Sequence, residues 1–421
     1  RKGCTLNLLS NPSEQYENYK IDAKFDCYKW DPQFLDQNTL AKHVLVLSRE
    51  EAEELSELTE KLDLETRTAE EFLLHHPSLW KVLALPRKLY PELKRMKNYD
   101  AKRHVRLTRY DFHPTKNDNS GQIVWKVSEV NSDVPGGFAE SSLLPKLAMQ
   151  YLKNDRYTSI DFGSIFAGAL AKKIPSNGTI MFVHCTSFSD DRQVMQYIGD
   201  KMESLGYHSL YGAADHLDFK NQESYSLLSG YEGKIDGIVR FTPIEWIKDM
   251  HPKTWSGYFD TITPSCNHPI SIFAQTKRFP FVWDTLEKNG IQLDTWRKLL
   301  PKTTEVHERK QLNDFIYKPA MGRVGEKISI EDACMEGEYQ AILKDVKKHS
   351  KNYLAQEKFI SKPLISPEGE SFHVCLGSYA VDGKHAGFYA RISTKTRIDS
   401  EAQDIPVIIE RKDNHERKRS I

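Results

Sequence analysis

Four side chains in two neighbouring β-rich stretches have the types and spacing of a metal and phosphate site. Arg109 and Asp111 lie two residues apart in "HVRLTRYDFHP", and Glu129 and Asn131 lie two apart in "GQIVWKVSEVNSD". Side chains alternate along a strand, so all four share one face if the two strands pair. Carboxylate and amide oxygens suit Mg²⁺, and the arginine fork suits phosphate oxygens. A solvent-facing antiparallel sheet with ordinary cross-strand pairs has the same spacing.

A lysine followed by a glycine-containing loop stands in "YKPAMGRVGEKI", between two stretches that are typical of strands. Lys318 supplies a point charge before the loop, which carries Gly322, Arg323, Gly325 and Lys327. Glycines allow backbone N–H groups to close over phosphate oxygens. The stretch is not a Walker loop, because GxxxxGK[ST] is absent and no helix follows directly. A plain hairpin with a glycine turn explains the same residues.

A late arginine completes the set of charged candidates. Arg391 in "GFYARIST" shares alternate spacing with Tyr389 and Ser393 in an otherwise apolar strand. It could stabilise charge that develops on a transferred phosphoryl group, or it could be an edge residue that reaches out to water. Together the three clusters indicate a nucleotide site without a Walker motif. Glu129 and Asn131 would hold magnesium there, and the Pro-Gly-Gly loop after them would line the place where a substrate carboxylate meets the γ-phosphate.

Several kinds of element must position these residues. The turn-rich "TKNDNSG" favours a hairpin formed by residues 104–114 and 121–133. Residues 38–100 predict helix from the apolar spacing of "REEAEELSELTEKL" and of the stretch after it. From about residue 176 the order strand, helix, strand, strand is typical of a small parallel sheet with helices on its faces. A second β-rich block, interrupted by one helix, begins at residue 314.

Length and charge limit the classes of protein to consider. The chain of 421 residues exceeds the size at which single cores stop growing, which predicts two or three structural units. Lys+Arg and Asp+Glu both number 59, so the net charge favours neither nucleic acid nor an anionic membrane as partner. The six cysteines are scattered without zinc-type spacing, and free thiols are expected. No membrane span or secretory core is visible, so we expect a cytoplasmic protein.

In their order along the chain, these motifs resemble those of the glutathionylspermidine synthase-like ligases, a family with an ATP-grasp fold. "RYDF" followed by "EVNSDVPGG" is similar to the family's Arg-x-Asp followed by "EYNAD", and "KPAMGRVGEKIS" is similar to its "KPxxGRxGxxI". "TPIEW" at 242–246 and "GSYAVDGKHAGFYAR" extend the resemblance over most of residues 100–410. The joint order of the motifs is far more specific than any one of them.

The resemblance implies an α/β (α+β) permuted ATP-grasp fold, in which the metal-binding residues precede the lysine segment. It implies a mainly helical N-terminal region over residues 1–100 and a first part of the core, with the metal ligands, over 101–170. A βαβ domain of pre-ATP-grasp type would follow over 171–300. The second part of the core, with the lysine, the glycine loop and the arginine, would occupy 301–421.

The resemblance also implies an ATP- and Mg²⁺-dependent ligase. Such an enzyme activates a small-molecule or peptide carboxylate as an acyl phosphate, joins it to an amine such as a polyamine, and releases ADP and phosphate. Residue by residue, it implies that Asp111, Glu129 and Asn131 bind magnesium, that Arg109 binds the γ-phosphate and that Arg391 stabilises the transferring group. Lys318 and the loop 322–327 would hold the ATP phosphates, and Gln356 and Glu357 in "LAQEKF" would contribute to nucleotide binding.

One departure from the family concerns the substrates. After "EVNSD" the family has Thr or Ser residues near its peptide substrate, whereas this chain has Val134, Pro135, Gly136 and Gly137. Glutathione as the acid and spermidine as the amine therefore stay open. The alternatives are a ligase for another peptide or natural-product acid and amine, and a nucleotide-binding protein of the same fold that ligates nothing. The completeness of the charged set speaks against the second alternative.

Overall fold

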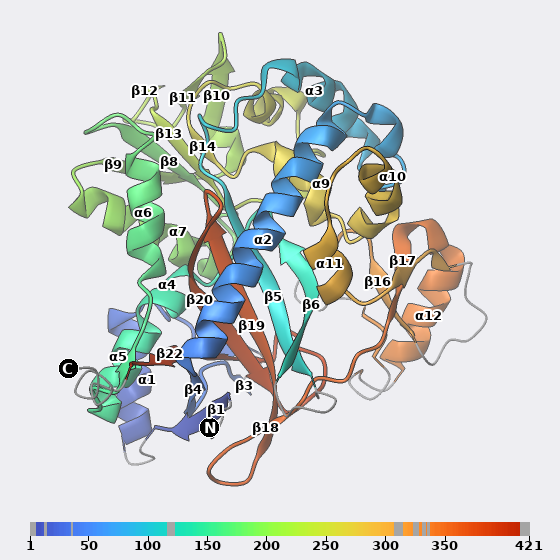
Figure 1. Cartoon of the computed structure of the whole chain (residues 1–421). Coiled ribbons are helices and arrows are strands. Elements are labelled where there is room, and N and C mark those ends of the chain that lie inside the picture. The colour runs from blue at the N-terminus through green and yellow to red at the C-terminus, as the bar shows by residue number, and fades with distance from the viewer. Residues whose placement is uncertain are drawn as a thin grey trace, which may run out of the picture.

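A six-stranded antiparallel sheet forms the centre of the chain (Figure 1). The computed structural model describes residues 6–11, 15–34, 37–115, 123–306, 315–322, 328–330, 334 and 337–412. The central sheet has the order β21-β20-β19-β5-β6, and β18 pairs with the start of β19. Its strands are β5 (Leu107–Thr115), β6 (Val124–Asn131), β18 (Leu364–Ile365), β19 (Ser371–Val381), β20 (Lys384–Ser393) and β21 (Gln403–Ile405).

The predicted hairpin of the two β-rich stretches is confirmed. β5 pairs with β6 antiparallel, with Arg109 opposite Asn131 and Asp111 opposite Glu129. The register shifts after Asp111, which leaves Ser128 as the extra residue of a β-bulge on β6. Because directly opposite residues point to the same face, the register brings all four predicted side chains to one face of the sheet.

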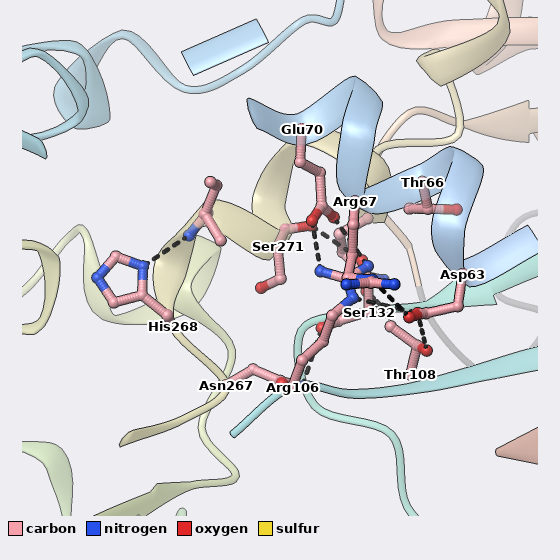
Figure 2. A network of polar contacts seen from close by, with 12 residues as sticks. Asp63, Thr66, Arg67, Glu70, Arg106, Thr108, Ser132, Asn267, His268 and Ser271 are labelled. Carbon is pink, nitrogen blue, oxygen red and sulfur yellow. Dashed lines mark hydrogen bonds and ion pairs between the residues drawn. The ribbon is translucent and has the colours of Figure 1, made fainter. Parts of the chain in front are cut away.

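The long helix α2 (Arg49–Leu74) lies across the other face of the central sheet (Figure 1). It begins at a capping box, in which the Ser48 hydroxyl accepts from the Glu51 N–H and the Glu51 carboxylate accepts from the Ser48 N–H. Polar residues of α2 also face the sheet. Figure 2 shows Asp63 and Glu70 of the helix converging on Arg106, just before β5. The helix is thus fixed to the sheet by both apolar packing and buried ion pairs.

A four-stranded parallel sheet confirms the strand–helix–strand pattern expected from residue 176 onward. Its order is β14-β13-β8-β9, and every neighbouring pair in it is parallel. The strands are β8 (Thr179–Val183), β9 (His208–Gly212), β13 (Gly237–Arg240) and β14 (Ser265–Cys266), and α7 (Ser189–Ser204) connects β8 to β9. A small antiparallel sheet of β10 (Leu217–Lys220), β11 (Glu223–Ser226) and β12 (Gly233–Lys234) follows β9.

The predicted lysine strand is β16 (Phe315–Pro319), in a three-stranded sheet of order β15-β17-β16. β15 (Thr303–Thr304) and β17 (Tyr353–Glu357) complete this sheet, and α12 (Glu338–Lys348) lies beside it (Figure 1). The second strand expected after the glycine loop is not found in the described part of that stretch. Residues 328–330 lie next to β16, where Ser329 exchanges hydrogen bonds with Tyr317, but they form no strand.

One expectation about the N-terminal region is wrong. The stretch from residue 38 does not begin as helix, because β4 (His43–Leu47) is a fully buried strand and α2 starts only at Arg49. The apolar run "HVLVL" directly precedes the helical pattern, so periodicity alone merged the two. β4 lies in a sheet of order β1-β4-β22-β7, which joins strands from the N-terminal and C-terminal parts of the described residues. Its other strands are β1 (Asn7–Ser10), β7 (Tyr157–Thr158) and β22 (Val407–Glu410).

The remaining elements cover these sheets. The helices are α1 (Tyr16–Asp26), α3 (Tyr90–Arg95), α4 (Phe138–Ser142), α5 (Leu144–Leu152), α6 (Phe162–Ala171), α8 (Ile244–Ile247), α9 (Ile272–Gln275), α10 (Trp283–Lys288) and α11 (Asp294–Leu299), and β2 (Gln33–Phe34) pairs with β3 (Gln37–Asn38). Within the described ranges, no helix has the length and apolar character needed to cross a bilayer. The five described cysteines are free thiols, as expected.

Candidate functional site

The face of the central sheet that α2 does not cover carries the predicted Arg109, Asp111, Glu129, Asn131 and Arg391. Thr108 and Tyr110 of β5 contact Asp63 of α2, so the alternating Arg109 and Asp111 point the other way. The partners of Asp111 across the sheet are Glu129 on β6 and Gly377 on β19. The same face continues to Arg391 on β20. Segments that are far apart in sequence therefore meet on this face.

Arg109 and Asp111 form a bidentate ion pair. Nε of Arg109 donates to Oδ1 of Asp111 at 2.8 Å, and Nη2 donates to Oδ2 at 3.1 Å. Nδ2 of Asn131 also donates to Oδ2 of Asp111, at 3.0 Å. Arg109 is 9% exposed and Asp111 is 3% exposed. The arginine thus fixes the orientation of the predicted metal-binding carboxylate, and the amide fixes its second oxygen.

Glu129 faces two lysines that come from outside the central sheet. Nζ of Lys277 lies 3.0 Å from Oε2 of Glu129 and donates to the carbonyl of Gly322 at 2.7 Å. The backbone N–H of Lys277 donates to the carbonyl of Ala320 at 2.9 Å. Nζ of Lys318 donates to the carbonyl of Ser128, beside Glu129, at 3.2 Å. Lys277 and Lys318 therefore join the central sheet to the β15-β17-β16 sheet at Glu129.

Burial and charge perturb the protonation of these groups. Burial alone would raise the pKa of Glu129, but Lys277 and Lys318 outweigh that effect and hold it well below its usual range. Burial lowers the pKa of Lys318 to about 8, in spite of the neighbouring Glu129. Titratable groups with such shifts in a cavity are typical of functional sites. The arrangement holds a carboxylate and two cations in a low-dielectric place, where charges interact strongly.

A small cavity opens between the two sheets at this point. Its lining includes Glu129, Lys277, Lys318 and Gln356, together with aromatic and aliphatic side chains. Nε2 of Gln356 donates to Thr303 at 3.0 Å, but its buried Oε1 accepts no hydrogen bond from the described residues. A buried carbonyl without a donor is costly, so the position suits a ligand that carries an N–H.

Not every residue of the predicted nucleotide set reaches the cavity. Glu357 is exposed, and its N–H donates to the carbonyl of Lys302 at 2.9 Å. Gly322 lies at the site through its carbonyl, which Lys277 binds. Arg323, Gly325 and Lys327 lie outside the described residues.

The Pro-Gly-Gly loop after β6 packs directly against the arginine of the site. The carbonyl of Gly136 accepts from Nη1 of Arg109 at 3.0 Å and from the Tyr379 hydroxyl. Gly137 has φ +88°, and a Cβ there would lie 2.7 Å from the Tyr389 ring. Both the left-handed backbone and the close ring favour glycine at 137. The glycines therefore position backbone against Arg109 and Tyr389, where a larger side chain would not fit.

A buried ion pair fixes the beginning of the same loop to the parallel sheet. Asp133 accepts from Nη1 of Arg240 on β13 at 3.2 Å, and its second oxygen is bound by Nη2. Asp133 also accepts from the N–H of Ile244, in the stretch "TPIEW", at 3.0 Å. Nδ2 of Asn267 donates to the carbonyls of Ser132 and Asp133 at 3.0 Å each. The position of Asn131 thus depends on contacts from residues over a hundred positions away.

Arg391 lies half-buried at the far side of the face. It stands opposite Cys375 on β19 and Asp404 on β21, and its Nη1 donates to the carbonyl of Asp399 at 3.0 Å. Burial, with a smaller effect of Asp111, raises the pKa of the Cys375 thiol, which also interacts with Arg391 and Arg109. Arg391 therefore belongs to the same electrostatic cluster as the first two strands.

The oxygen ligands fit a hard cation. Among the described residues, no three His, Cys, Asp or Glu side chains gather into a metal site by themselves. The predicted set instead combines two directly opposite carboxylates, Asp111 and Glu129, with the amide of Asn131. Mg²⁺ needs only one or two protein carboxylates when waters and phosphate oxygens complete its shell. The donor chemistry is thus compatible with magnesium that arrives together with a nucleotide.

Sequence reasoning missed Lys277, which makes two contacts at the centre of the site. It lies in "QTKRFP", a stretch without glycine, periodicity or a recognisable motif. Its neighbour Arg278 is buried and binds the carbonyl of Tyr353 at 3.2 Å, next to the start of β17. Only the tertiary structure brings this stretch against Glu129, so no local signal could have found it.

Comparison with solved structures shows the fold through one neighbour. A glutathione synthetase-like effector from Globodera pallida, solved in its apo form, superposes with a TM-score of 0.63 at 14% identity, over 94% of this chain and 97% of that chain. A candidate gamma-glutamylcysteine synthetase from Methylobacillus flagellatus gives a TM-score of 0.43 at 12% identity, over 79% and 88%. A sequence comparison with curated proteins gives no match.

The family comparison covers nearly the whole chain. The glutathionylspermidine synthase pre-ATP-grasp family matches residues 17–410. This range includes both strands of the predicted metal site, the lysine strand and the late arginine. The chain therefore belongs to the glutathionylspermidine synthase pre-ATP-grasp family.

Proposed function

We propose that this chain is an ATP-dependent ligase that joins a carboxylic acid to an amine through an acyl phosphate and releases ADP and phosphate. Family membership supports the reaction class. The single observation that carries the proposal is the meeting of Glu129 with Lys277 and Lys318 at the cavity between two sheets. Phosphoryl transfer needs positioned cations and a metal site more than a nucleophilic side chain; two lysines lie at this place, and the oxygens of Asp111, Glu129 and Asn131 are the proposed metal ligands.

The proposed fold is a permuted ATP-grasp. Its first half would be the hairpin β5–β6 with the metal ligands, and its second half would be the sheet with Lys318 together with β19 and β20. The parallel sheet within residues 171–300 would be the inserted pre-ATP-grasp-like domain. This order is supported by the sequence positions, because the metal-bearing strands precede the lysine strand.

The ATP phosphates would be held by Lys318, Lys277 and the loop 322–327, with Gln356 and, more weakly, Glu357 toward the base. Asp111, Glu129 and Asn131 would hold Mg²⁺, which offsets phosphate charge when it is bound. Lys277 now balances Glu129, and it is 9% exposed at its side chain. If Glu129 held a cation, the ammonium of Lys277 would be free to bind a phosphate oxygen. Such an exchange would keep these buried charges paired.

The two arginines would act on the substrate side. Bringing a carboxylate to the γ-phosphate places two anions together, and Arg391 would offset the charge that develops during transfer. Arg109 would bind the γ-phosphate after it exchanges its contact with the Gly136 carbonyl, while its bidentate pair holds Asp111 in place. The amine would then attack the activated acyl carbon and phosphate would leave.

A second candidate function is nucleotide binding without ligation. The observation in its favour is that Arg109 is 9% exposed and uses Nε, Nη1 and Nη2 on Asp111 and Gly136. If these contacts never exchange, the arginine cannot reach a phosphate. A ligase for an acid and amine other than glutathione and spermidine is the further alternative, because Val134, Pro135, Gly136 and Gly137 replace the family's hydroxyl residues.

The test is ADP release by the purified protein with Mg²⁺ and ATP. Four reactions are compared: no addition, glutathione, spermidine, and both, followed by a panel of other peptide acids and amines. We expect ADP only when an acid and an amine are both present, with a product of their summed mass less one water. Binding of Mg²⁺–ATP without ADP release in any combination would replace the ligase by the non-catalytic alternative.

A further inference from the structure

A buried group of opposite charges lies at the edge of the proposed site and takes no part in the roles described above. Nζ of Lys29, in the loop after α1, lies 2.6 Å from Oδ2 of Asp404 and 3.4 Å from Oε1 of Glu140. The Lys29 side chain is 11% exposed, and both carboxylates are 8% exposed. Asp404 belongs to β21 and Glu140 to α4, so three separate segments build this cluster.

The cluster holds more acceptors than its own ammonium satisfies. Nε2 of Gln193 donates to Oε1 of Glu140 at 2.9 Å, but the buried Oε2 has no hydrogen-bond donor among the described residues. Burial, helped by Asp404, raises the pKa of Glu140. For Lys29, burial opposes the charge, but Asp404 and Glu140 raise the pKa above its ordinary value. One ammonium therefore lies between two carboxylates, and Oε2 of Glu140 is left without a hydrogen-bond donor among the described residues.

A single aromatic ring connects this cluster to the proposed catalytic arginines. The hydroxyl of Tyr389 donates to Oδ1 of Asp404 at 2.6 Å. The same ring lies 4.9 Å from the guanidinium carbon of Arg109. Asp404 also stands directly opposite Arg391 across β20 and β21. Asp404, which binds Lys29, is thus linked through Tyr389 to Arg109 and pairs across the strands with Arg391, the two arginines that the proposed function places at the transferring group.

We propose that Asp404 and Glu140 form an ammonium-binding subsite and that Lys29 of the chain itself occupies it. The inference rests on the proposed function for its meaning in catalysis. While Lys29 fills the subsite, an acceptor amine that brings a second ammonium there meets both an occupied volume and a like charge. Lys29 is then a specificity-determining residue, and it selects amines without a second cationic group at this position.

The binding claim is tested without turnover. Lys29→Ala removes the ammonium and leaves a cavity lined by two carboxylates, which ethylammonium can fill. We expect ethylammonium chloride to raise the Tm of Lys29→Ala by several degrees in a dose-dependent way, because a ligand that binds only the folded state stabilises it. The wild type and the double variant Lys29→Ala/Asp404→Asn should not respond, and tetramethylammonium chloride at equal concentration should act on none of the three. An equal response of the wild type and Lys29→Ala, or no response of Lys29→Ala, would overturn the subsite.

The variant can fail to fold on its own, because it leaves two buried carboxylates without a cation. Cells are therefore also lysed, and Lys29→Ala purified, with ethylammonium or with tetramethylammonium in every buffer. Recovery of folded protein by ethylammonium alone supports the subsite, and no recovery with either ion counts against it.

A second experiment distinguishes failure of the subsite from failure of the proposed ligase activity. Wherever ADP release is found, the acceptors n-butylamine and 1,4-diaminobutane are compared by kcat/KM, because they differ in one ammonium. We expect the ratio of diamine to monoamine to rise at least ~10-fold in Lys29→Ala, the size expected of a charged hydrogen bond. An unchanged ratio would mean that Lys29 does not determine the specificity for the acceptor amine. Ethylammonium binding without any ligation would leave the subsite in place and remove the proposed function.

Discussion

The two faces of the central sheet both carry buried charge, but they hold it differently. On the face under α2, Arg106 binds Asp63 and Glu70 of one helix (Figure 2). Arg67 of the same helix lies 3.1 Å from Asp63, and Thr108 and Tyr110 donate to Asp63. On this face, one helix and the strand beside it supply each other's charge partners, which is the arrangement of a structural ion pair, although a cavity lined by Glu70 and Arg106 adjoins them.

The opposite face gathers charge from segments that are not sequence neighbours and leaves room between them. Glu129 meets Lys277 and Lys318 at a cavity, and Gln356 keeps an oxygen without a described donor. Thr108 and Arg109 are successive residues of one strand, so they point to opposite faces and lie in different kinds of environment. Both faces adjoin a cavity, so the number of separate segments that supply the charges distinguishes them: Glu129, Lys277 and Lys318 come from three segments.

The largest expected effect is on turnover and concerns the face that carries Arg109, Glu129 and Arg391, which we call the open face. Glu129→Ala and Arg391→Ala should each lower ADP release by about 10³-fold, because each removes a charge that acts on the transferring phosphoryl group. Both variants should stay folded in differential scanning fluorimetry, although the Tm of Glu129→Ala should fall because Lys277 and Lys318 lose their carboxylate partner. The control is Glu232→Ala, an exposed glutamate distant from the site in sequence. Wild-type ADP release by either site variant would remove its assigned role.

Substitutions on the face under α2, which we call the closed face, should lower the free energy of unfolding and leave turnover unchanged. Arg106→Met leaves Asp63 and Glu70 buried without their cation, which should cost about 3–5 kcal/mol of folding free energy. Urea unfolding measures this loss, and kcat of the remaining folded protein should be unchanged. A loss of kcat in fully folded Arg106→Met would mean that the two faces are not separable in the way described here.

A substitution at Lys277 tests the one site residue that only the structure identifies. Lys277→Met keeps most of the side-chain volume and removes the ammonium that contacts Glu129 and Gly322. We expect KM for ATP to rise about 10- to 100-fold, which corresponds to one lost charge-assisted hydrogen bond. Lys220→Met, at an exposed lysine on β10, is the matched control. An unchanged KM would make Lys277 a structural bridge between the two sheets.

The smallest expected effect is a pH dependence of stability. The pKa of Lys318 is about 8 in the folded chain, below the ~10.4 of an unfolded lysine, so between these values the unfolded chain binds more protons. Stability therefore rises with pH in this window, and the wild type should gain about 2 kcal/mol relative to Lys318→Met between pH 8 and pH 10. Parallel urea curves at both pH values give the difference. A constant difference would mean that Lys318 titrates normally.

The sequence predicted the parts of the site that repeat a local pattern. Alternation along "RYD" and "EVN" placed Arg109, Asp111, Glu129 and Asn131 on one face, and the register confirms it. Local patterns failed where an apolar strand runs directly into a capped helix at Ser48. In "LAQEKF" both Gln356 and Glu357 were predicted to bind nucleotide. Side chains alternate along a strand, so only Gln356 faces the cavity and Glu357 is exposed.

Other parts of the site had no sequence signal. Lys277 reaches Glu129 only because two sheets meet there. Lys29 is 375 residues away from Asp404 along the chain, and nothing in its neighbourhood distinguishes it from a surface lysine before the fold is known. Long-range charge partners depend on topology, and a single sequence does not contain the contacts that set their pKa values.

The central claim is that the open face of the sheet binds Mg²⁺–ATP and the closed face does not take part. The most direct measurement is isothermal titration of Mg²⁺–ATP into the wild type, Glu129→Ala, Lys318→Met and Arg106→Met, with and without Mg²⁺. We expect magnesium-dependent binding to the wild type and Arg106→Met, and at least ~10-fold weaker binding to Glu129→Ala and Lys318→Met. Absence of binding to the wild type, or equal affinity of all four proteins, would contradict it.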